Sequence, residues 1–155
     1  MKKIILLSMI IVMIDQLAKF FINKFVCYAS SIKIISFLNF FNITNIHNSG
    51  VVFGIFKEKN LLFSILILFL LTIILILFSK NFYKINKIRR YAFCFMISGG
   101  TGNLIDRFLY GGIIDFFDFG ICYLRWPSFN VADICICISI ILVFIDILNL
   151  NSKRV

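Results

Sequence analysis

Residues 61–78 are the most constraining feature of this chain, because they run for 18 positions without a charged side chain. Only Ser64 and Thr72 interrupt the apolar run, and both hydroxyls can hydrogen-bond back to their own helix. A transmembrane α-helix needs roughly 20 mainly apolar residues. The segment therefore predicts a membrane-spanning helix and places the chain among membrane proteins.

The composition of the whole chain points the same way. Of its 155 residues, 61% are hydrophobic and only 15% are charged, and the mean hydropathy is +1.03. Soluble domains average about 25% charged residues. At this length about four spans fit and a separate soluble domain does not. We therefore expect an all-α membrane protein with one integral domain over residues 1–155.

Three other apolar stretches complete a predicted set of four transmembrane helices, at residues 4–21, 61–78, 91–109 and 131–148. The first could be a cleavable secretory signal, but Asp15, Gln16 and Lys19 interrupt it and no small-residue cleavage site follows closely. It is read as a retained span. The third carries small residues that let membrane helices approach closely, which predicts tight packing against a neighbour: Ser98, Gly99, Gly100 and Gly102.

Basic residues cluster at both ends and in the middle of the chain, with no acidic residue among them: Lys2, Lys3, Lys80, Lys84, Lys87, Arg89, Arg90, Lys153 and Arg154. Such clusters are typical of cytoplasmic segments. Both termini and a loop at residues 79–90 are therefore predicted to be cytoplasmic, with outer loops at residues 22–60 and 110–130. This orientation signal explains the net charge of +9 better than a nucleic-acid-binding surface does, so no nucleic acid partner is expected.

Two local patterns add detail. Residues 32–46 are rich in β-branched and aromatic side chains with partial alternation, which predicts a small sheet or hairpin on the outer membrane surface. The five cysteines are an odd number and do not suggest a disulfide framework. Cys135 and Cys137 lie at i, i+2 on different helix faces, which argues against a metal site.

Ionisable side chains within or beside membrane spans are costly, so each is a functional candidate unless it has a structural partner. Asp15 and Lys19, at i, i+4 in the outer half of the first span, are interpreted as a structural ion pair. Asn103, Asp106 and Arg107 share one face near the outer end of the third span. Asp115 follows in the outer loop, and Asp133 opens the fourth span. Aspartates from separate segments therefore converge at one membrane depth.

Each aspartate also has a structural explanation. Asp133 could be a helix N-cap, Asp106 could pair with Arg107, and Asp115 and Asp118 could be solvated loop residues. Taken together they favour hydrolysis, because two close carboxylates can share a proton, one acting as acid and the other as base. The pattern alone does not say which two pair. A small proton-coupled membrane transporter is the alternative, since intramembrane charges also mark proton relays.

Five motifs in order along the chain resemble those of the lipoprotein signal peptidases, or signal peptidase II family. They are Asp15 with Lys19, HNSGVVFG at residues 47–54, SGGTGNLIDR at 98–107, GGIIDF at 111–116 and FNVAD at 129–133. The resemblance implies an aspartyl protease that removes signal peptides from diacylglyceryl-modified prolipoproteins, cutting before the lipidated cysteine. The family usually has alanines where this chain has Val51 and Val52, two bulkier residues that would narrow the nearby substrate groove.

The resemblance also assigns roles. It places the catalytic pair on Asp115 and Asp133 and leaves Asp118 without a catalytic role. The family's substrate-contacting and supporting positions fall on Asn48, Gly50, Asn103, Asp106, Arg107 and Asn130. It implies no metal and no organic cofactor, diacylglyceryl-prolipoproteins and membrane lipids as partners, and a monomer. The expected location is the bacterial inner membrane, multi-pass, with the active site at the periplasmic face.

Overall fold

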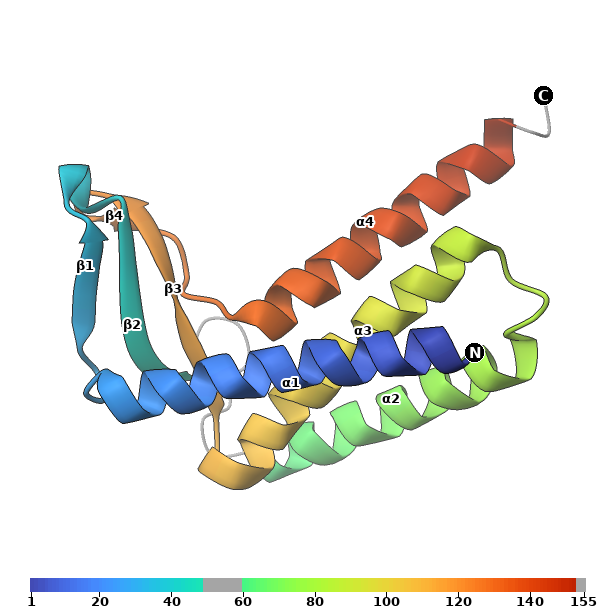
Figure 1. Ribbon diagram of the computed structural model, residues 1–155, viewed down its shortest axis with the longest axis horizontal. Coiled ribbons are helices and arrows are strands. Elements are labelled where there is room, and N and C mark those ends of the chain that lie inside the picture. Colours follow the sequence, from blue (N-terminus) through green and yellow to red (C-terminus); the bar gives the residue numbers. More distant parts are fainter. Residues whose placement is uncertain (49–59, 153–155) are drawn as a thin grey trace.

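The computed structural model describes residues 1–48 and 60–152, as four long helices and one small antiparallel sheet (Figure 1). The helices are α1 (Lys2–Phe25), α2 (Asn60–Asn81), α3 (Lys87–Tyr110) and α4 (Val131–Ser152). The strands are β1 (Ser31–Ile35), β2 (Phe41–Asn48), β3 (Ile113–Ile121) and β4 (Leu124–Arg125), in that order across the sheet, with a short 3₁₀ turn, η1 (Phe37–Asn39), between β1 and β2. The sheet lies at one end of the helices, and the start of α1, the end of α4 and the α2–α3 loop lie at the other end.

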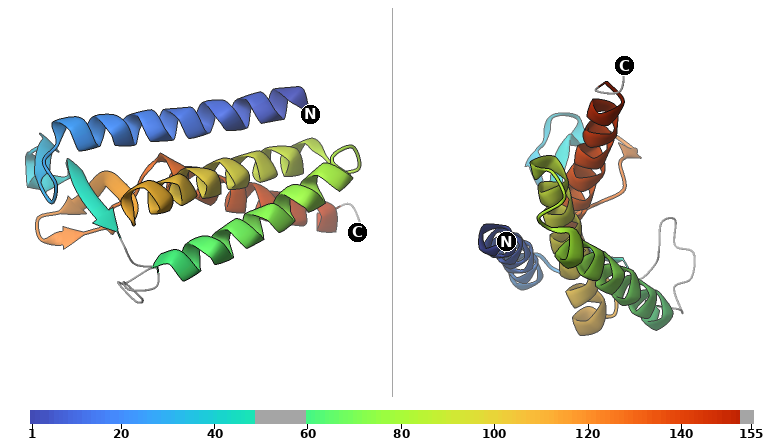
Figure 2. Two further views of the ribbon diagram at one scale, coloured as in Figure 1. Left: turned by 90° about the horizontal axis from the view of Figure 1, so that it is seen from below. Right: turned by 90° about the vertical axis from the view of Figure 1, so that its right-hand side faces the viewer.

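The predicted helices are present, each a few residues longer than its apolar stretch. Helices α1, α2 and α4 each contain a segment long and apolar enough to cross a membrane, with mean hydropathies of 2.1, 2.3 and 2.7. Helix α3 is less apolar because it carries the glycines and polar residues. It packs against the other three helices and occupies the centre of the bundle (Figure 2).

The distribution of side chains is the reverse of that in a soluble bundle. Large apolar side chains such as Met9, Phe69 and Phe144 are about 60% exposed on the outer surface. Asp106 and Asn130 are completely buried inside. In a bilayer the exposed apolar surface faces lipid, and the interior carries the polar groups that lipid cannot satisfy.

Small residues of α3 set the helix spacing, as the sequence predicts. A Cβ on Gly99 would lie 2.4 Å from the backbone oxygen of Ala132 in α4. A Cβ on Gly102 would lie 2.6 Å from the carboxylate of Asp15 in α1. Only glycine therefore permits these approaches, which bring α1 and α4 against the half of α3 nearer the sheet.

The two segments predicted to be outer loops hold more strand than the sequence predicts. The hairpin expected within residues 32–46 is present as β1 and β2. Residues 110–130, expected to be a loop, instead supply β3 and β4. Strand β3 is buried along most of its length, so it lacks the alternation by which a strand with one solvated face is recognised. Its main partner, β2, lies about 70 residues earlier in the chain, so the pairing is not visible in the local sequence either.

Candidate active site

A cleft of about 640 Å³ lies where the sheet meets the helices. Asp115 of β3 and Asp133 of α4 both line it, with Arg107 of α3 beside them. The guanidinium of Arg107 is close enough to both carboxylates to interact with them electrostatically. The opposite wall is apolar and comes mainly from α2, through Ile67, Leu70, Leu71 and Ile74. The cleft therefore joins two carboxylates to a surface suited to an apolar chain.

Asp115 is held by two amides. Its Oδ1 accepts a hydrogen bond from Nδ2 of Asn130 at 2.8 Å, and its Oδ2 accepts one from Nδ2 of Asn48 at 3.2 Å. Asn48 pairs with Ile113 across β2 and β3, so Asp115 is its diagonal neighbour on the same face of the sheet. The Asp115 side chain is 4% exposed.

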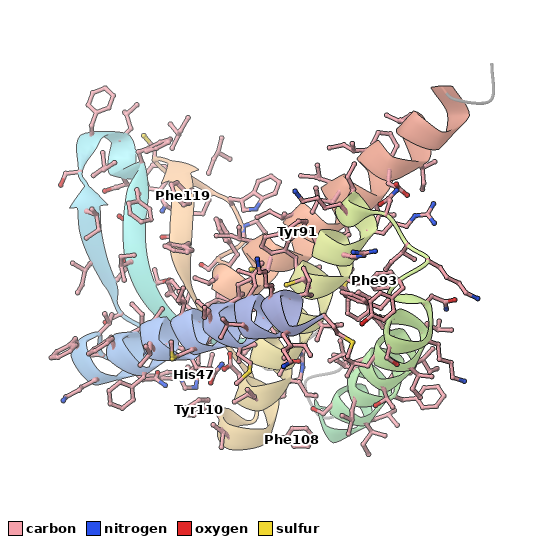
Figure 3. All side chains as sticks on the ribbon, turned by 45° about the vertical axis from the view of Figure 1, so that its right-hand side comes forward. His47, Tyr91, Phe93, Phe108, Tyr110 and Phe119 are labelled. Carbon is pink, nitrogen blue, oxygen red and sulfur yellow. The ribbon has the colours of Figure 1, made fainter. Side chains whose placement is uncertain are left out.

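The end of β2 is fixed against both α1 and α3, which positions Asn48. The ring of His47 lies 3.1 Å from Oδ1 of Asn23 in α1, measured from Nε2. The same ring lies 6.1 Å from the ring of Tyr110, at the end of α3 (Figure 3). The single histidine of the chain thus has a packing role at the edge of the site.

Asp133 lies in the first turn of α4, and the local sequence explains its orientation. Asn130 Oδ1 accepts from the backbone N–H of Asp133 at 3.0 Å, and Asp133 Oδ2 accepts from the backbone N–H of Asn130 at 3.1 Å. This reciprocal pair is a capping box with Asn and Asp in place of the commoner residues. The remaining oxygen, Oδ1, accepts from Nδ2 of Asn103 at 2.8 Å.

Asn130 connects the two carboxylates. Its side chain is fully buried, and its Nδ2 lies 2.8 Å from Asp115 Oδ1, 3.1 Å from Asn103 Oδ1 and 3.3 Å from the Ile114 carbonyl. Its Oδ1 meanwhile caps α4 at Asp133. One amide therefore fixes β3, α3 and the start of α4 relative to one another.

The environment of Asp115 favours its protonated form. Burial raises the pKa of Asp115, and the negative charge of Asp133 raises it further, to about 7. The hydrogen bonds from Asn48 and Asn130 and the charge of Lys19 act in the opposite direction and are outweighed. The two carboxylates can therefore share one proton near neutral pH.

The Asp15–Lys19 ion pair is present and extends further than the sequence predicts. Lys19 Nζ lies 2.7 Å from Asp15 Oδ2 and also 2.7 Å from Asp106 Oδ2. Asp106 therefore pairs with Lys19 rather than with its neighbour Arg107. Gln16 also contributes, donating to Asp106 Oδ1 at 2.9 Å. Sequence reasoning noted Gln16 only as an interruption of the span, although a third polar residue there is itself a signal.

Asp118, to which the resemblance gives no catalytic role, lies apart from this arrangement. Asp118 pairs with Arg125 at 2.7 Å and accepts from Asn42 at 3.0 Å, on the part of the sheet away from the cleft. Gly50, with Val51 and Val52, lies outside the residues that the structure describes. Within the described ranges, no group of three or more His, Cys, Asp or Glu side chains is placed to hold a metal ion.

Fold and site together define a multi-pass membrane protein with a paired-carboxylate cleft at one end of its bundle. Residues 7–149 match the signal peptidase (SPase) II family. Lipoprotein signal peptidases of Fusobacterium nucleatum and Coxiella burnetii are 36% and 32% identical to the chain. These alignments cover 97% and 96% of this chain and 88% and 91% of the relatives.

Two solved structures of bacterial membrane enzymes, determined by the in meso method, have the same fold. One, at 2.3 Å resolution, gives a TM-score of 0.87 at 31% identity over 100% of this chain and 93% of the other. The second, at 1.9 Å, gives 0.83 at 32% identity over 96% and 94%. The chain therefore belongs to the signal peptidase II family, the proteases that cleave signal peptides from prolipoproteins. This assignment does not support the transporter alternative.

Proposed function

We propose that the protein is an aspartic endopeptidase in which Asp115 and Asp133 form the catalytic dyad. It removes the signal peptide from diacylglyceryl-modified prolipoproteins and cuts before the lipidated cysteine. The observation that carries this proposal is the link through Asn130, which places the two carboxylates on one cleft. One chain supplies both carboxylates and the amides that bind them, so the proposed active unit is a monomer.

The proposed chemistry needs one proton on the dyad. Asp115, whose pKa is raised to about 7, donates that proton to the carbonyl oxygen of the scissile bond. Asp133 takes a proton from water, and the water oxygen attacks the carbonyl carbon. Collapse of the tetrahedral intermediate breaks the C–N bond, and the leaving amine takes the proton from Asp133 while Asp115 recovers its own. Asn48, Asn103 and Asn130 hold the carboxylates in place.

The proposed topology has four spans, with α3 as the central one, in the inner membrane. Both termini and residues 79–90 are cytoplasmic, and the dyad is at the periplasmic face. The support is the cation-rich sequence at the start of α1 and around the α2–α3 connection, two segments that lie at the end of the bundle opposite the sheet (Figure 1). At the sheet end, Tyr123 and Trp126 are 99% and 70% exposed, as aromatic residues at a membrane interface are.

This topology is testable by labelling. Lys84 is exposed in the α2–α3 connection. A Lys84→Cys variant, with Cys27 and Cys122 replaced by serine, should resist an impermeant thiol reagent in intact cells and react after lysis. Tyr123→Cys, in the same background, is the matched control and should react in intact cells. Strong labelling at position 84 from outside would overturn the orientation.

The substrate proposal is tested by removing the lipid. Acyl chains stay in the leaflet with about 0.8 kcal/mol for each buried CH₂, so they hold the substrate cysteine at the depth proposed for the dyad. Part of that binding energy can serve orientation of the scissile bond. The diacylglyceryl form should therefore be processed with a higher kcat/KM than the unlipidated prolipoprotein, with the cut located by mass spectrometry. Equal kcat/KM values would refute the role of the lipid.

A further inference from the structure

The ion pair between Asp15 and Lys19 is connected to both members of the proposed dyad. Asp15 Oδ1 accepts from the backbone N–H of Ala132 at 2.9 Å, the residue before Asp133. Asp106 Oδ2 accepts from the backbone N–H of Ile114 at 3.2 Å, the residue before Asp115. Each carboxylate that pairs with Lys19 therefore also holds the backbone next to one catalytic candidate.

Lys19 joins these two carboxylates. Its ammonium lies 2.7 Å from each, and its side chain is only 1% exposed. Two buried carboxylates facing each other without this cation would repel, because charges in a poorly hydrated interior are weakly screened. The spacing between the backbone at Ala132 and the backbone at Ile114 thus depends on the Lys19 charge.

A third contact runs through the side chain of Asn103. Lys19 Nζ donates to Asn103 Oδ1 at 3.2 Å, and Asn130 Nδ2 donates to the same oxygen at 3.1 Å. With its oxygen fixed in this way, Asn103 must present its NH₂ group to Asp133 Oδ1, at 2.8 Å. A flipped amide would turn an oxygen toward the Asp133 carboxylate and an NH₂ group toward the ammonium, and both contacts would be lost.

We propose that Lys19 is a positioning residue of the reaction, acting through Asn103 on Asp133 and through Asp15 and Asp106 on the backbone beside the dyad. This inference rests on the proposed assignment of Asp115 and Asp133. It goes beyond a structural role for the α1 ion pair, because a pair that only joined α1 to α3 would need none of the three connections to the reacting groups.

A double-mutant cycle on kcat tests the route through Asn103. Lys19→Met removes the charge and keeps the length, and misplacing reacting groups by about 1 Å can cost a hundredfold in rate. We expect Lys19→Met and Asn103→Ala each to lower kcat by about tenfold to a hundredfold. The double variant should be little slower than Asn103→Ala alone, because the two residues act in series.

Arg89→Met is the matched control, since it removes another cation that pairs with a buried aspartate, Asp146, far from the cleft. It should lower Tm and leave kcat within about twofold of the wild type. In the double variant with Asn103→Ala, the two effects on kcat should multiply. If the losses of kcat caused by Lys19→Met and Asn103→Ala multiply in the double variant, the role of Lys19 is structural and the inference is wrong. The same conclusion follows if Lys19→Met lowers Tm and leaves kcat unchanged.

If Lys19→Met is too unstable to purify, a charge-matched variant replaces it. Lys19→Met with Asp106→Asn keeps the formal charge of the cluster at −1, because one ammonium and one carboxylate disappear together. An asparagine at 106 still offers an oxygen to the Ile114 N–H. This variant is compared with Asp106→Asn alone, and a further loss of kcat of about tenfold or more is expected. If the kcat of this variant is no lower than that of Asp106→Asn alone, the inference is wrong.

The pH dependence of kcat supplies an independent readout. Asp115 is surrounded by the charges of Asp133 from α4, Lys19 from α1 and Arg107 from α3. Since the Lys19 charge lowers the pKa of Asp115, its removal should move the alkaline limb of the profile to higher pH. An unchanged profile would contradict the inference. Retained turnover in Asp115→Asn or Asp133→Asn would instead contradict the proposed function, so the two failures are distinguishable.

Discussion

Aspartates with buried or half-buried carboxylates lie at opposite ends of the same bundle. At the sheet end, Asp115 and Asp133 are bound by the amides of Asn48, Asn103 and Asn130. At the other end, Asp146 of α4 binds Nε of Arg89 at 2.5 Å and also accepts from Asn86, both of which belong to the start of α3. Amides hydrogen-bond to the two carboxylates at the sheet end, with the Arg107 charge nearby, whereas the carboxylate of Asp146 pairs directly with a guanidinium.

Under the proposed assignment of the dyad, this difference separates a reactive arrangement from a structural one. A carboxylate neutralised by a guanidinium stays ionised and has no proton to give. Two carboxylates held by neutral amides, close enough for each charge to affect the other, can share a proton. Cavity size does not distinguish the two ends, because Asp146 lines a cavity of about 700 Å³, slightly larger than the cleft at the dyad.

The largest expected effect comes from removing either carboxylate at the sheet end. Asp115→Asn and Asp133→Asn should each lower kcat by about a thousandfold or more, since acid and base catalysis contributes roughly 10²–10⁴-fold per group. Substrate binding should persist, because the apolar wall from α2 is untouched. Turnover of a lipidated prolipoprotein, followed by gel shift, measures the loss.

Asp146→Asn is the control for this comparison. It leaves Arg89 without its carboxylate, so Tm should fall while kcat stays within about twofold. If Asp146→Asn were folded but inactive while Asp115→Asn and Asp133→Asn stayed active, the roles assigned to the two ends of the bundle would have to be exchanged.

The second expected effect concerns pH. If Asp115 acts as the acid, kcat should fall by about tenfold per unit as pH rises above 7, the approximate pKa of this group. Stability should change as well, because the folded state holds this proton more tightly than the unfolded chain, whose aspartates titrate near about 4. The stabilising contribution is complete below pH of about 4 and is lost as pH rises to about 7.

Thermal unfolding in detergent between pH 4 and 8 tests the stability half of this prediction. The Asp115→Asn variant should lose less stability over this range than the wild type. Asp146→Asn should follow the wild type, since it leaves Asp115 intact. Parallel Tm curves for all three proteins would show that Asp115 does not carry the proton.

A third effect concerns how helix packing reaches the dyad. A methyl group on Gly99 would lie 2.4 Å from the Ala132 backbone oxygen, so Gly99→Ala must move the start of α4, which carries Asp133. Both Tm and kcat should decrease, with kcat lower by about tenfold for a shift of a fraction of an ångström. Ser139→Ala removes a 2.7 Å hydrogen bond to the Ala92 carbonyl, nearer the other end of these helices. It should lower Tm alone, and an equal loss of kcat in both variants would contradict local control.

The sequence predicts those features that depend on the membrane or on one helix. Lipid forces apolar residues to the outside of every span, so the four helices are visible in hydropathy, and the small residues of α3 mark its packing faces. The i, i+4 spacing of Asp15 and Lys19 is likewise local. Each of these needs no knowledge of which elements meet in space.

Contacts between distant segments could not be predicted in the same way. Strand β3 exists because β2 pairs with it, and its burial on both faces hides the strand pattern. The choice of Lys19 over Arg107 as partner of Asp106 depends on how α1 packs against α3. The bridging position of Asn130 depends on β3, α3 and α4 meeting at one point, and only the resemblance to a family singled this residue out.

The smallest expected effect is at Asp118, which differs from Asp115 by three positions on the same strand. Asp118 resembles Asp146 more than the dyad, because a guanidinium neutralises it: Arg125 lies 2.7 Å away and Asn42 also donates to it. Asp118→Asn keeps the shape and removes a partly exposed ion pair, which is worth about 1 kcal/mol or less. We expect kcat within about threefold of the wild type, a small decrease in Tm, and an unchanged alkaline limb, because Asp118 has no part in the proton transfer. Steady-state turnover across pH measures kcat and the alkaline limb on the same substrate, and thermal unfolding measures Tm. If Asp118→Asn were inactive and Asp115→Asn active, the catalytic carboxylate on β3 would have been assigned to the wrong residue, and neutralisation by a cation would no longer distinguish structural from reactive carboxylates in this protein.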